Sequence, residues 1–329
     1  MAFHTNLSDT APVGRDAPQP PLVAVAGPTG AGKSALSLEI AIALGGEVVN
    51  CDSLQVYRHF NIGTAKLPLS ERRGVPHHLI DILNPDEIFT AGEYARLARM
   101  AVAEITARGR VPVIAGGTGF YLRALLDGLF EGPSRDPGMR ERLAAREARR
   151  PGSLHRLLCR FDAQTAAKIH PNDVPKVTRA LEVCLLTRRP VSELFREGRD
   201  ALQGYRVLKL GLMPDRDRLY ESLDARCAAM FEGGLVEEVK AILALGYSPE
   251  CKPFESHGYK QTLQMLKGEL TPKEALFYAQ RNTRNYAKRQ MTWFRKESGM
   301  RWFKGFSPDV CDAAIAAVRE FLGPRADAQ

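Results

Sequence analysis

The sequence predicts an α/β fold, with a P-loop NTPase-like parallel sheet core and a helical insertion domain. Three observations lead to this prediction. Short apolar runs that are typical of buried strands alternate with helical stretches, as in a parallel sheet. Two of these runs end in glycine-rich turns. Between the fourth and fifth predicted strands, residues 131–204 show helical patterns and no strand pattern.

Composition sets limits on the class of protein. The 329 residues include 46 Lys or Arg and 38 Asp or Glu, which gives a net charge of +8, and 44% of the residues are hydrophobic. This surplus fits either an ordinary basic surface or a polyanionic partner such as nucleic acid. The six scattered cysteines, without a C-x-x-C pair, indicate reduced thiols. With neither a secretory signal nor an apolar run of about 20 residues, we expect a cytoplasmic, monomeric protein without a membrane partner.

Shifts in pattern divide the chain into four predicted segments. They are a flexible tail (residues 1–20), the first part of the core (21–130), a helical insertion (131–204) and the mainly helical, basic second part of the core (205–329).

The first predicted strand, residues 23–26, leads into the sequence G-x-x-x-x-G-K-S, a phosphate-binding loop. Successive backbone N–H groups and the N-terminus of the following helix, residues 35–44, favour an anion there. Lys33 adds a cation and Ser34 a hydroxyl for Mg²⁺. Most loops of this kind bind ATP or GTP, and the pattern alone does not identify the ligand. The predicted phosphate-binding residues are Gly27, Pro28, Thr29, Gly30, Ala31, Gly32, Lys33 and Ser34.

The second predicted strand, residues 47–51, ends at Asp52. Ligands of parallel sheets bind beyond the carboxyl ends of the strands, so Asp52 should lie near the phosphate loop. The alternative is that Asp52 only caps the next turn. A third strand is predicted within residues 74–82, where His77 or His78 either reaches the site or serves the structure.

A helix is predicted over residues 90–107, with Thr90 as its N-cap. The fourth strand, residues 111–115, ends in a second glycine turn in which Thr118 could present its hydroxyl to the same ligand. An ordinary strand-to-helix turn is the alternative. The fifth strand, residues 206–212, is followed by Arg216, again just beyond a strand end.

Positive charge gathers in two places. Residues 131–204 carry 15 Lys or Arg and 10 Asp or Glu. In the helix predicted over residues 272–296, four cations share one face, whereas Ala279, Tyr286 and Trp293 lie on the opposite face, toward the core. A face without acids favours contact with a phosphate backbone over a solvated surface. The four cations are Arg281, Arg284, Lys288 and Arg295.

Taken together, the motifs resemble those of the tRNA dimethylallyltransferases, also called tRNA isopentenyltransferases. The resemblance covers nearly the whole chain. The matching motifs are GPTGAGKS (27–34), DSLQVY (52–57), PHHLID (76–81), GGTGFYL (116–122), HPNDVPKVTRALEV (170–183), PDRDRLY (214–220), HGYK (257–260) and KRQMTWFR (288–295).

The resemblance implies a different ligand from ATP. In this family the phosphate loop holds dimethylallyl diphosphate. The five-carbon group is transferred to N6 of adenosine-37, next to the tRNA anticodon, by displacement of diphosphate. The expected partners are therefore dimethylallyl diphosphate, Mg²⁺ and the anticodon stem-loop of tRNA, which the helical insertion would grip.

Residue roles follow from the same resemblance. Asp52 matches the base proposed to take the proton of the amine, and Thr118 matches the threonine that bonds the bridging oxygen of the leaving group. Lys33 and Arg216 would neutralise the diphosphate. The residues expected to contact tRNA are Asp52, Ser53, Leu54, Gln55, Thr118, Arg140, Pro175, Lys176, Val177, Thr178, Arg179, His257, Gly258, Tyr259, Lys260, Arg281, Arg284, Lys288, Arg289 and Arg295.

The sequence departs from the family pattern at two positions. Lys176 stands where arginine is common, and His257 where a small or aliphatic residue is usual. Three alternatives differ in class: prenylation of free adenine nucleotides, an ATP-dependent kinase or NTPase, and an RNA-binding module with an inactive phosphate site. The basic insertion argues against the first, the DSLQVY motif against the second, and the presence of Lys33, Asp52 and Thr118 against the third.

Overall fold

The computed structural model describes residues 19–130, 132–305 and 307–323. Residues 1–18, which make up most of the predicted tail, lie outside the described residues, as do residues 131, 306 and 324–329. The chain divides into two compact units. One comprises the chain up to residue 122 together with the chain from residue 203 onward, and we call it the core. The other comprises residues 123–202, and we call it the insertion.

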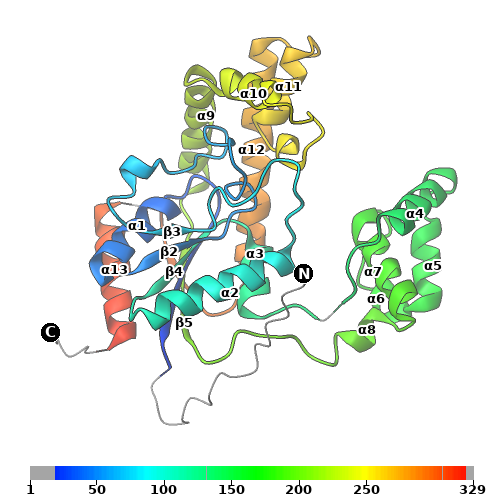
Figure 1. The fold of residues 1–329 in the computed structure, drawn as a ribbon, viewed down its shortest axis with the longest axis horizontal. Helices are drawn as coiled ribbons and strands as arrows, with labels where there is room; N and C mark the ends of the chain where they lie inside the picture. Colours follow the sequence, from blue (N-terminus) through cyan, green and yellow to red (C-terminus); the bar gives the residue numbers. More distant parts are fainter. Residues whose placement is uncertain (1–18, 131, 306, 324–329) are drawn as a thin grey trace, which may run out of the picture. The chain divides into compact units, whose positions relative to one another are not determined.

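The core contains a six-stranded sheet in which every neighbouring pair is parallel (Figure 1). The strand order is β3-β2-β4-β1-β5-β6. This arrangement confirms the predicted α/β class. The strands are β1 (Pro21–Ala26), β2 (Glu47–Asn50), β3 (His77–His78), β4 (Pro112–Gly116), β5 (Arg206–Leu212) and β6 (Met300–Phe303).

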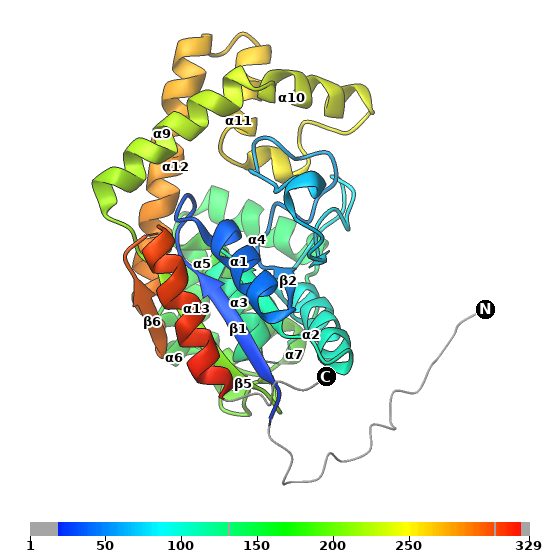
Figure 2. The same ribbon diagram turned by 90° about the vertical axis from the view of Figure 1, so that its left-hand side faces the viewer.

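Helices cover both faces of the sheet. Figure 2 shows α1 (Lys33–Leu44) and α13 (Pro308–Leu322) together in front of β1. Val23 and Val25 of β1 point to this face, where they join a buried cluster with Leu36 and Val318. Helices α2 (Ala91–Ala107) and α3 (Gly119–Leu126) lie on the opposite face. Burial on both faces explains the almost purely apolar sequence of β1.

The predicted limits are confirmed for α2 and for the end of α1, which begins at Lys33, two residues earlier than predicted. Gly32, which precedes α1, has a φ of 87°, a left-handed conformation that glycine adopts without steric cost. Gly45 ends the helix, also in the left-handed region. The side chain of Thr90 accepts a hydrogen bond from the Glu93 N–H at 3.2 Å and so caps α2.

Two strands differ from the prediction. Within residues 74–82, only His77 and His78 form a strand. Strand β6 was not predicted, because the region after residue 215 was expected to be mainly helical. Its four residues are too few to show an alternating pattern. Packing at the edge of the sheet stabilises it instead, since the Trp302 ring covers Gly211 of β5.

Four helices extend the core beyond the carboxyl ends of the strands (Figure 2). They are α9 (Arg216–Glu232), α10 (Leu235–Ala244), α11 (Tyr259–Leu266) and α12 (Pro272–Phe294). Apolar side chains of α10, α11 and the end of α9 pack on residues 56–60, where Phe60 contacts the rings of Phe254 and Tyr259. Helix α12 packs on α9, where Ala287 and Met291 join Leu219 and Leu223 in a buried cluster. These contacts hold the helices next to the ends of β2 and β4.

The insertion has its own core. Leu154, Leu158, Val177 and Leu181 are almost fully buried in it. Every regular element among its described residues is a helix, in agreement with the predicted helical character. The helices wholly within it are α4 (Pro137–Arg149), α5 (Ser153–Phe161), α6 (Ala163–Ala166), α7 (Val174–Thr187) and α8 (Val191–Leu194).

Among the described residues, no helix has the length and apolar character needed to cross a membrane.

Candidate functional site

The main cavity of the core, of about 640 Å³, lies where β1, β2 and β4 end and α9 and α12 pass. Its lining includes Thr29, Gly30, Gly32, Lys33, Ser34, Ala35, Asn50, Asp52, Ser53, Leu54, Gln55, Gly63, Thr64, Ala65, Ala115, Gly116, Gly117, Ser222, Arg226, Cys227, Ser256, His257, Gly258, Thr283, Tyr286, Arg289 and Gln290. The structure therefore brings the phosphate loop, the DSLQ segment and parts of two helices to one space.

The phosphate loop forms one wall of this cavity. Lys33 is the first residue of α1, so the unbonded N–H groups of the first helical turn lie beside its side chain. The Lys33 ammonium donates a hydrogen bond to the Pro28 carbonyl at 2.8 Å. No carboxylate lies within ion-pair distance of Lys33 in the described part of the chain. The loop therefore offers an anion both backbone donors and an unpaired cation.

Burial acts strongly on Lys33. Burial and, to a smaller extent, the nearby Arg226 lower the pKa of the ammonium, Asp52 raises it, and the net result is a pKa of about 8. A second positive charge in the same space makes the protonated form costly. A bound anion would relieve that cost, so the electrostatics of the cavity favour an anionic ligand.

Arg226 is the cation of the cavity that lies closest to the phosphate loop besides Lys33, because it bonds Thr29, whereas the predicted Arg216 does not line the cavity. Arg226 donates from Nη2 to the Thr29 hydroxyl at 2.8 Å, and its buried Nε–H has no partner among the described residues. Burial lowers its pKa. Arg216 lies at the start of α9, with its guanidinium over the Tyr220 ring, and it does not line the cavity. Its side chain is 67% exposed.

The sequence does carry a signal for Arg226. It follows Leu219 and Leu223 at helical spacing, and both leucines are buried. An arginine within the apolar stripe of an amphipathic helix is a buried charge that needs a partner. Proximity to a strand end favoured Arg216 instead.

Asp52 lines the cavity beside the phosphate loop and also caps a turn. Its Oδ1 accepts hydrogen bonds from the N–H groups of Leu54, at 2.8 Å, and Gln55, at 3.4 Å. No contact of its Oδ2 is recorded among the described residues, which leaves that oxygen to face a ligand. The Gln55 side chain donates to the Thr64 carbonyl at 3.1 Å and so supports the cavity wall.

Thr118 lies at the margin of the cavity and is not one of the lining residues. Its hydroxyl oxygen accepts a hydrogen bond from the Ser53 N–H at 3.1 Å. Ser53 lines the cavity. Thr118 thus joins the end of β2 to the turn after β4.

Gln290 was missed by the sequence analysis. Its Oε1 accepts from the Thr29 N–H and its Nε2 donates to the Gly117 carbonyl, both at 2.8 Å. It therefore bridges the two glycine turns. A Cβ on Gly117 would lie 2.5 Å from the Gln290 amide nitrogen, so a larger residue there would require this amide to move. Its spacing of four from Tyr286 was the available signal.

The predicted charged face of α12 is only partly correct. Arg281, Lys288 and Arg295 are exposed. Arg284, however, donates to both carboxylate oxygens of Asp224 on α9 at 2.5 Å, because this part of the face packs against that helix. Tyr286, expected to point toward the core, lines the cavity instead.

The HGYK turn contributes to the cavity wall more than to the surface. His257 packs edge-on against the Tyr286 ring, with 5.5 Å between centroids, and burial together with Arg289 lowers its pKa. Tyr259 is fully buried and donates to Glu238, so its side chain is not available for a predicted contact with tRNA. Gly258 is also buried, whereas Lys260 is exposed.

In the insertion, the predicted tRNA contacts divide by exposure. Pro175 and Lys176 are exposed, whereas Val177 and Thr178 are buried at the start of α7, where no tRNA could reach their side chains. Lys176 pairs with Asp173 at 2.5 Å. Arg179, like Arg140, bonds a buried carboxylate.

Glu182 of α7 is fully buried and holds two arginines. Arg140 donates to it from Nε at 2.8 Å and from Nη2 at 2.9 Å, and Arg179 donates from Nη1 at 2.6 Å. Burial alone would raise the pKa of Glu182, but these hydrogen bonds lower it to about 2. The guanidinium groups remain about one-third exposed.

The two adjacent histidines have structural partners. His78 Nε2 lies 2.6 Å from the Glu47 carboxylate, which Arg108 also contacts at 2.7 Å. His77 Nδ1 lies 2.9 Å from the Val75 carbonyl. Neither histidine lines the main cavity.

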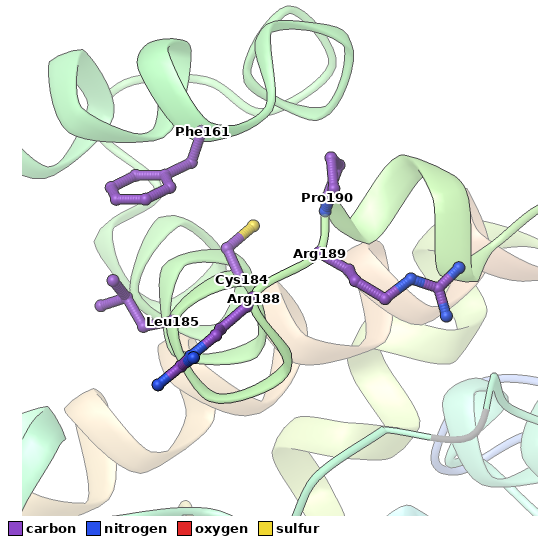
Figure 3. A pocket seen from close by; sticks show the side chains of 6 residues that line it. All are labelled: Phe161, Cys184, Leu185, Arg188, Arg189 and Pro190. Carbon is purple, nitrogen blue, oxygen red and sulfur yellow. The ribbon is translucent and has the colours of Figure 1, made fainter.

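The insertion has a smaller cavity of about 230 Å³ between α5, α7 and the start of α8 (Figure 3). None of the predicted site residues lines it. The lining residues are Phe161, Cys184, Leu185, Arg188, Arg189 and Pro190.

The donor set of the main cavity suits a hard cation. Among the described residues, no group of three His, Cys, Asp or Glu side chains is arranged to hold a metal. The Ser34 hydroxyl and the Asp52 carboxylate both face the cavity and supply oxygen, the ligand that Mg²⁺ prefers. A magnesium ion here would also need oxygens from a bound ligand and water.

Known proteins resemble this chain over most of its length. The model of the IPP transferase family matches residues 55–297. A tRNA dimethylallyltransferase of Solibacter usitatus is 72% identical over 305 residues, covering 92% of this chain and 99% of the relative. One from Koribacter versatilis is 55% identical and covers 88% and 95%.

Two solved structures of tRNA-modifying transferases also resemble this chain. The full-length tRNA isopentenylpyrophosphate transferase of Bacillus halodurans is 38% identical, with a TM-score of 0.67 and coverage of 92% of this chain and 95% of that one. A eukaryotic dimethylallyltransferase, described as acting on tRNA, is 30% identical, with a TM-score of 0.81 and coverage of 92% and 79%.

Proposed function

Because this chain belongs to the IPP transferase family and is a tRNA dimethylallyltransferase, we propose its donor, acceptor atom and mechanism. The donor is dimethylallyl diphosphate. The acceptor is N6 of adenosine-37, next to the tRNA anticodon. The amine attacks carbon 1 of the donor, the bond from this carbon to the bridging oxygen breaks, and diphosphate leaves with the electron pair.

The observation that carries the proposal is the pair of cations, Lys33 and Arg226, that share the cavity with the phosphate loop. Neither has a carboxylate partner in the described part of the chain, and burial disfavours the charge on both. Diphosphate gains negative charge as it leaves, so fixed donors and cations at this place lower the barrier. Arg226 takes the role that the sequence assigned to Arg216.

Asp52 is the proposed base. Its carboxylate lines the same cavity as Lys33 and Arg226, and the backbone hydrogen bonds to Oδ1 fix its orientation. The exocyclic amine of adenine becomes acidic only as the new bond to carbon forms, so a carboxylate can accept the proton at that stage. The target base must leave its stack to reach this position.

Ser34, the diphosphate oxygens and water would hold Mg²⁺. When bound, Mg²⁺ neutralises part of the charge on the leaving group. Ser34 is suited to this role because it follows Lys33 at the N-terminus of α1 and lines the cavity.

We propose that tRNA binds to the exposed cations of α12 and of the insertion, with the protein acting as a monomer in the cytoplasm. Arg281, Lys288 and Arg295 support this assignment on α12 because they are exposed. Arg289 lines the cavity, where it would meet the flipped nucleotide. In the insertion, the exposed edges of Arg140, Lys176 and Arg179 support it.

The test is an incubation of the protein with unmodified tRNA, Mg²⁺ and either dimethylallyl diphosphate or ATP. The expected result is N6-isopentenyladenosine by nucleoside mass spectrometry, with one diphosphate released per modified base, only when the prenyl donor is present. A tRNA with guanosine at position 37 is the matched control and should remain unmodified. Hydrolysis of ATP without a modified nucleoside would overturn the proposal.

A further inference from the structure

Gln290 connects helix α12 to both glycine turns of the cavity, and the proposed chemistry gives it no role. Its Oε1 accepts from the Thr29 N–H and its Nε2 donates to the Gly117 carbonyl, each at 2.8 Å. Only one orientation of the amide satisfies both bonds, because an N–H needs an acceptor and a carbonyl needs a donor. Gln290 is only 7% exposed, so water competes little for these bonds.

The bond to Thr29 fixes the peptide group between Pro28 and Thr29. This group is trans and planar, so its N–H and its C=O point in opposite directions. Because the N–H is directed to Gln290, the Pro28 carbonyl faces the other way. There it accepts a hydrogen bond from the Lys33 ammonium at 2.8 Å. The orientation of this one peptide therefore sets the position of the Lys33 ammonium.

The bond to Gly117 brings the second glycine turn next to the same lysine. A Cβ on Gly117 would lie 3.5 Å from the Lys33 ammonium nitrogen. Thr29 is held from a further side, since its hydroxyl accepts from Arg226 of α9 at 2.8 Å. Side chains of α9 and α12, distant in sequence, thus hold the phosphate loop in place around Lys33.

We propose that Gln290 is a positioning residue that orients the Pro28–Thr29 peptide and so places the Lys33 ammonium for the diphosphate. Without Gln290, the Thr29 N–H loses its acceptor, and the peptide is free to turn its carbonyl oxygen toward the cavity. That oxygen would repel the diphosphate, and the Lys33 ammonium would lose its fixed position. The inference rests on the proposed function, in which Lys33 binds the diphosphate of the donor.

The Lys33 ammonium keeps donors for the ligand while it is held. An ammonium group has three protons, and the Pro28 carbonyl accepts only one of them. The benefit of Gln290 should therefore appear in the binding of diphosphate itself. Affinity for tRNA should not depend on Gln290, because the proposed tRNA contacts of α12 are its exposed cations.

The test compares Gln290→Met with Gln280→Met by calorimetric titration of inorganic diphosphate in the presence of Mg²⁺. Methionine keeps the length of glutamine but has no amide. Gln280 lies on the same helix, donates to the Asp224 carbonyl at 3.1 Å and does not line the cavity. We expect Gln290→Met to bind diphosphate about 10-fold more weakly and Gln280→Met to stay within about 2-fold of the unsubstituted protein. Unchanged binding in Gln290→Met would overturn the assignment.

A double-mutant cycle separates positioning from direct contact. If Gln290 acts through Lys33, adding Gln290→Met to Lys33→Ala should weaken diphosphate binding by less than about 2-fold. A further loss of about 10-fold in that background would mean that Gln290 contacts the diphosphate itself or acts by another route, which contradicts the inference.

Affinity for tRNA, measured by filter binding, separates positioning from a general loss of structure. It should be the same in the unsubstituted protein, Gln290→Met and Gln280→Met. If Gln290→Met lost affinity for tRNA as much as for diphosphate, Gln290 would support the fold as a whole and would not position Lys33.

Failure of this inference can be told apart from failure of the proposed function, because binding of inorganic diphosphate requires no prenyl transfer. If the unsubstituted protein forms no N6-isopentenyladenosine, the proposed function fails. If it forms this product and Gln290→Met binds diphosphate as tightly as the unsubstituted protein does, only the role of Gln290 is excluded.

Discussion

The arginines of the main cavity and of the insertion are in opposite electrostatic situations. Arg226 shares the main cavity with Lys33, lacks a carboxylate partner among the described residues, and keeps a buried Nε–H unbonded. Arg140 and Arg179 bond the buried carboxylate of Glu182, and this contact raises the pKa of Arg140. A buried cation without a partner costs stability and indicates a ligand site, whereas a cation that is paired with a buried carboxylate indicates a structural role.

The largest effect should follow removal of an uncompensated cation. Lys33→Ala should lower kcat/KM for dimethylallyl diphosphate about 1000-fold, since the leaving group loses a preorganised charge. The melting temperature should not fall, because an unpaired buried charge is also removed. Steady-state kinetics and thermal unfolding measure the two quantities. Lys240→Ala, on the exposed side of α10, is the control, and a parallel loss of stability in Lys33→Ala would contradict the comparison.

The arginines paired with Glu182 should behave in the opposite way, because removal of their partner should lower stability. Glu182→Ala leaves Arg140 and Arg179 without their buried partner and should lower the free energy of unfolding by about 3 kcal/mol. Because the pKa of Glu182 is lowered to about 2, its contribution is present above the unfolded pKa, near 4.5, and is lost as pH falls from there toward 2.

Denaturant unfolding at pH 7 and pH 3 checks this prediction. Glu193→Ala, which removes an exposed carboxylate near Arg189, is the control and should change little. If Glu182→Ala were as stable as the unsubstituted protein at pH 7, the arginines would not depend on that carboxylate.

The exposed cations of α12 should have a smaller effect, confined to tRNA. Arg281→Glu combined with Lys288→Glu should weaken tRNA binding about 10-fold and reduce the slope of log K against log salt by about one for each lost phosphate contact. Filter binding over a range of salt concentrations measures both. Lys240→Glu is the charge-matched control. An unchanged slope in the double variant would mean that this face of α12 is an ordinary solvated surface that does not contact tRNA.

The smallest effect concerns pH. Lys33 has a pKa of about 8 in the free protein, and only its protonated form attracts the diphosphate. Donor affinity should be constant below about pH 7, should halve by pH 8 and should fall about 5-fold more from pH 8 to pH 9 as the proton is lost. Equilibrium binding across this range measures it. Lys33→Arg should remove the dependence, since arginine stays charged; a dependence that persists would assign the titration to another group.

Local motifs predicted the half of the site that lies on loops at strand ends. Gly32, Lys33 and Asp52 are adjacent to strand ends, and a parallel sheet brings such ends to one edge. The other half lies on helices, where tertiary packing decides which face is inside. Arg226 and Gln290 are on such faces, and Arg284 was assigned to the surface because its partner, Asp224, is 60 residues away in sequence. Strand β6 was also missed, because its pairing partner, β5, is distant in sequence.

The central claim is that the phosphate loop and helix α9 together bind the diphosphate, with Arg226 as the cation from the helix. Calorimetric titration of dimethylallyl diphosphate into Arg226→Ala and Arg216→Ala tests it most directly. We expect Arg226→Ala to bind dimethylallyl diphosphate about 100-fold more weakly, because charge-assisted hydrogen bonds are lost. The affinity of Arg216→Ala should stay within about 2-fold of that of the unsubstituted protein. Weakened binding in Arg216→Ala with unchanged binding in Arg226→Ala would contradict it.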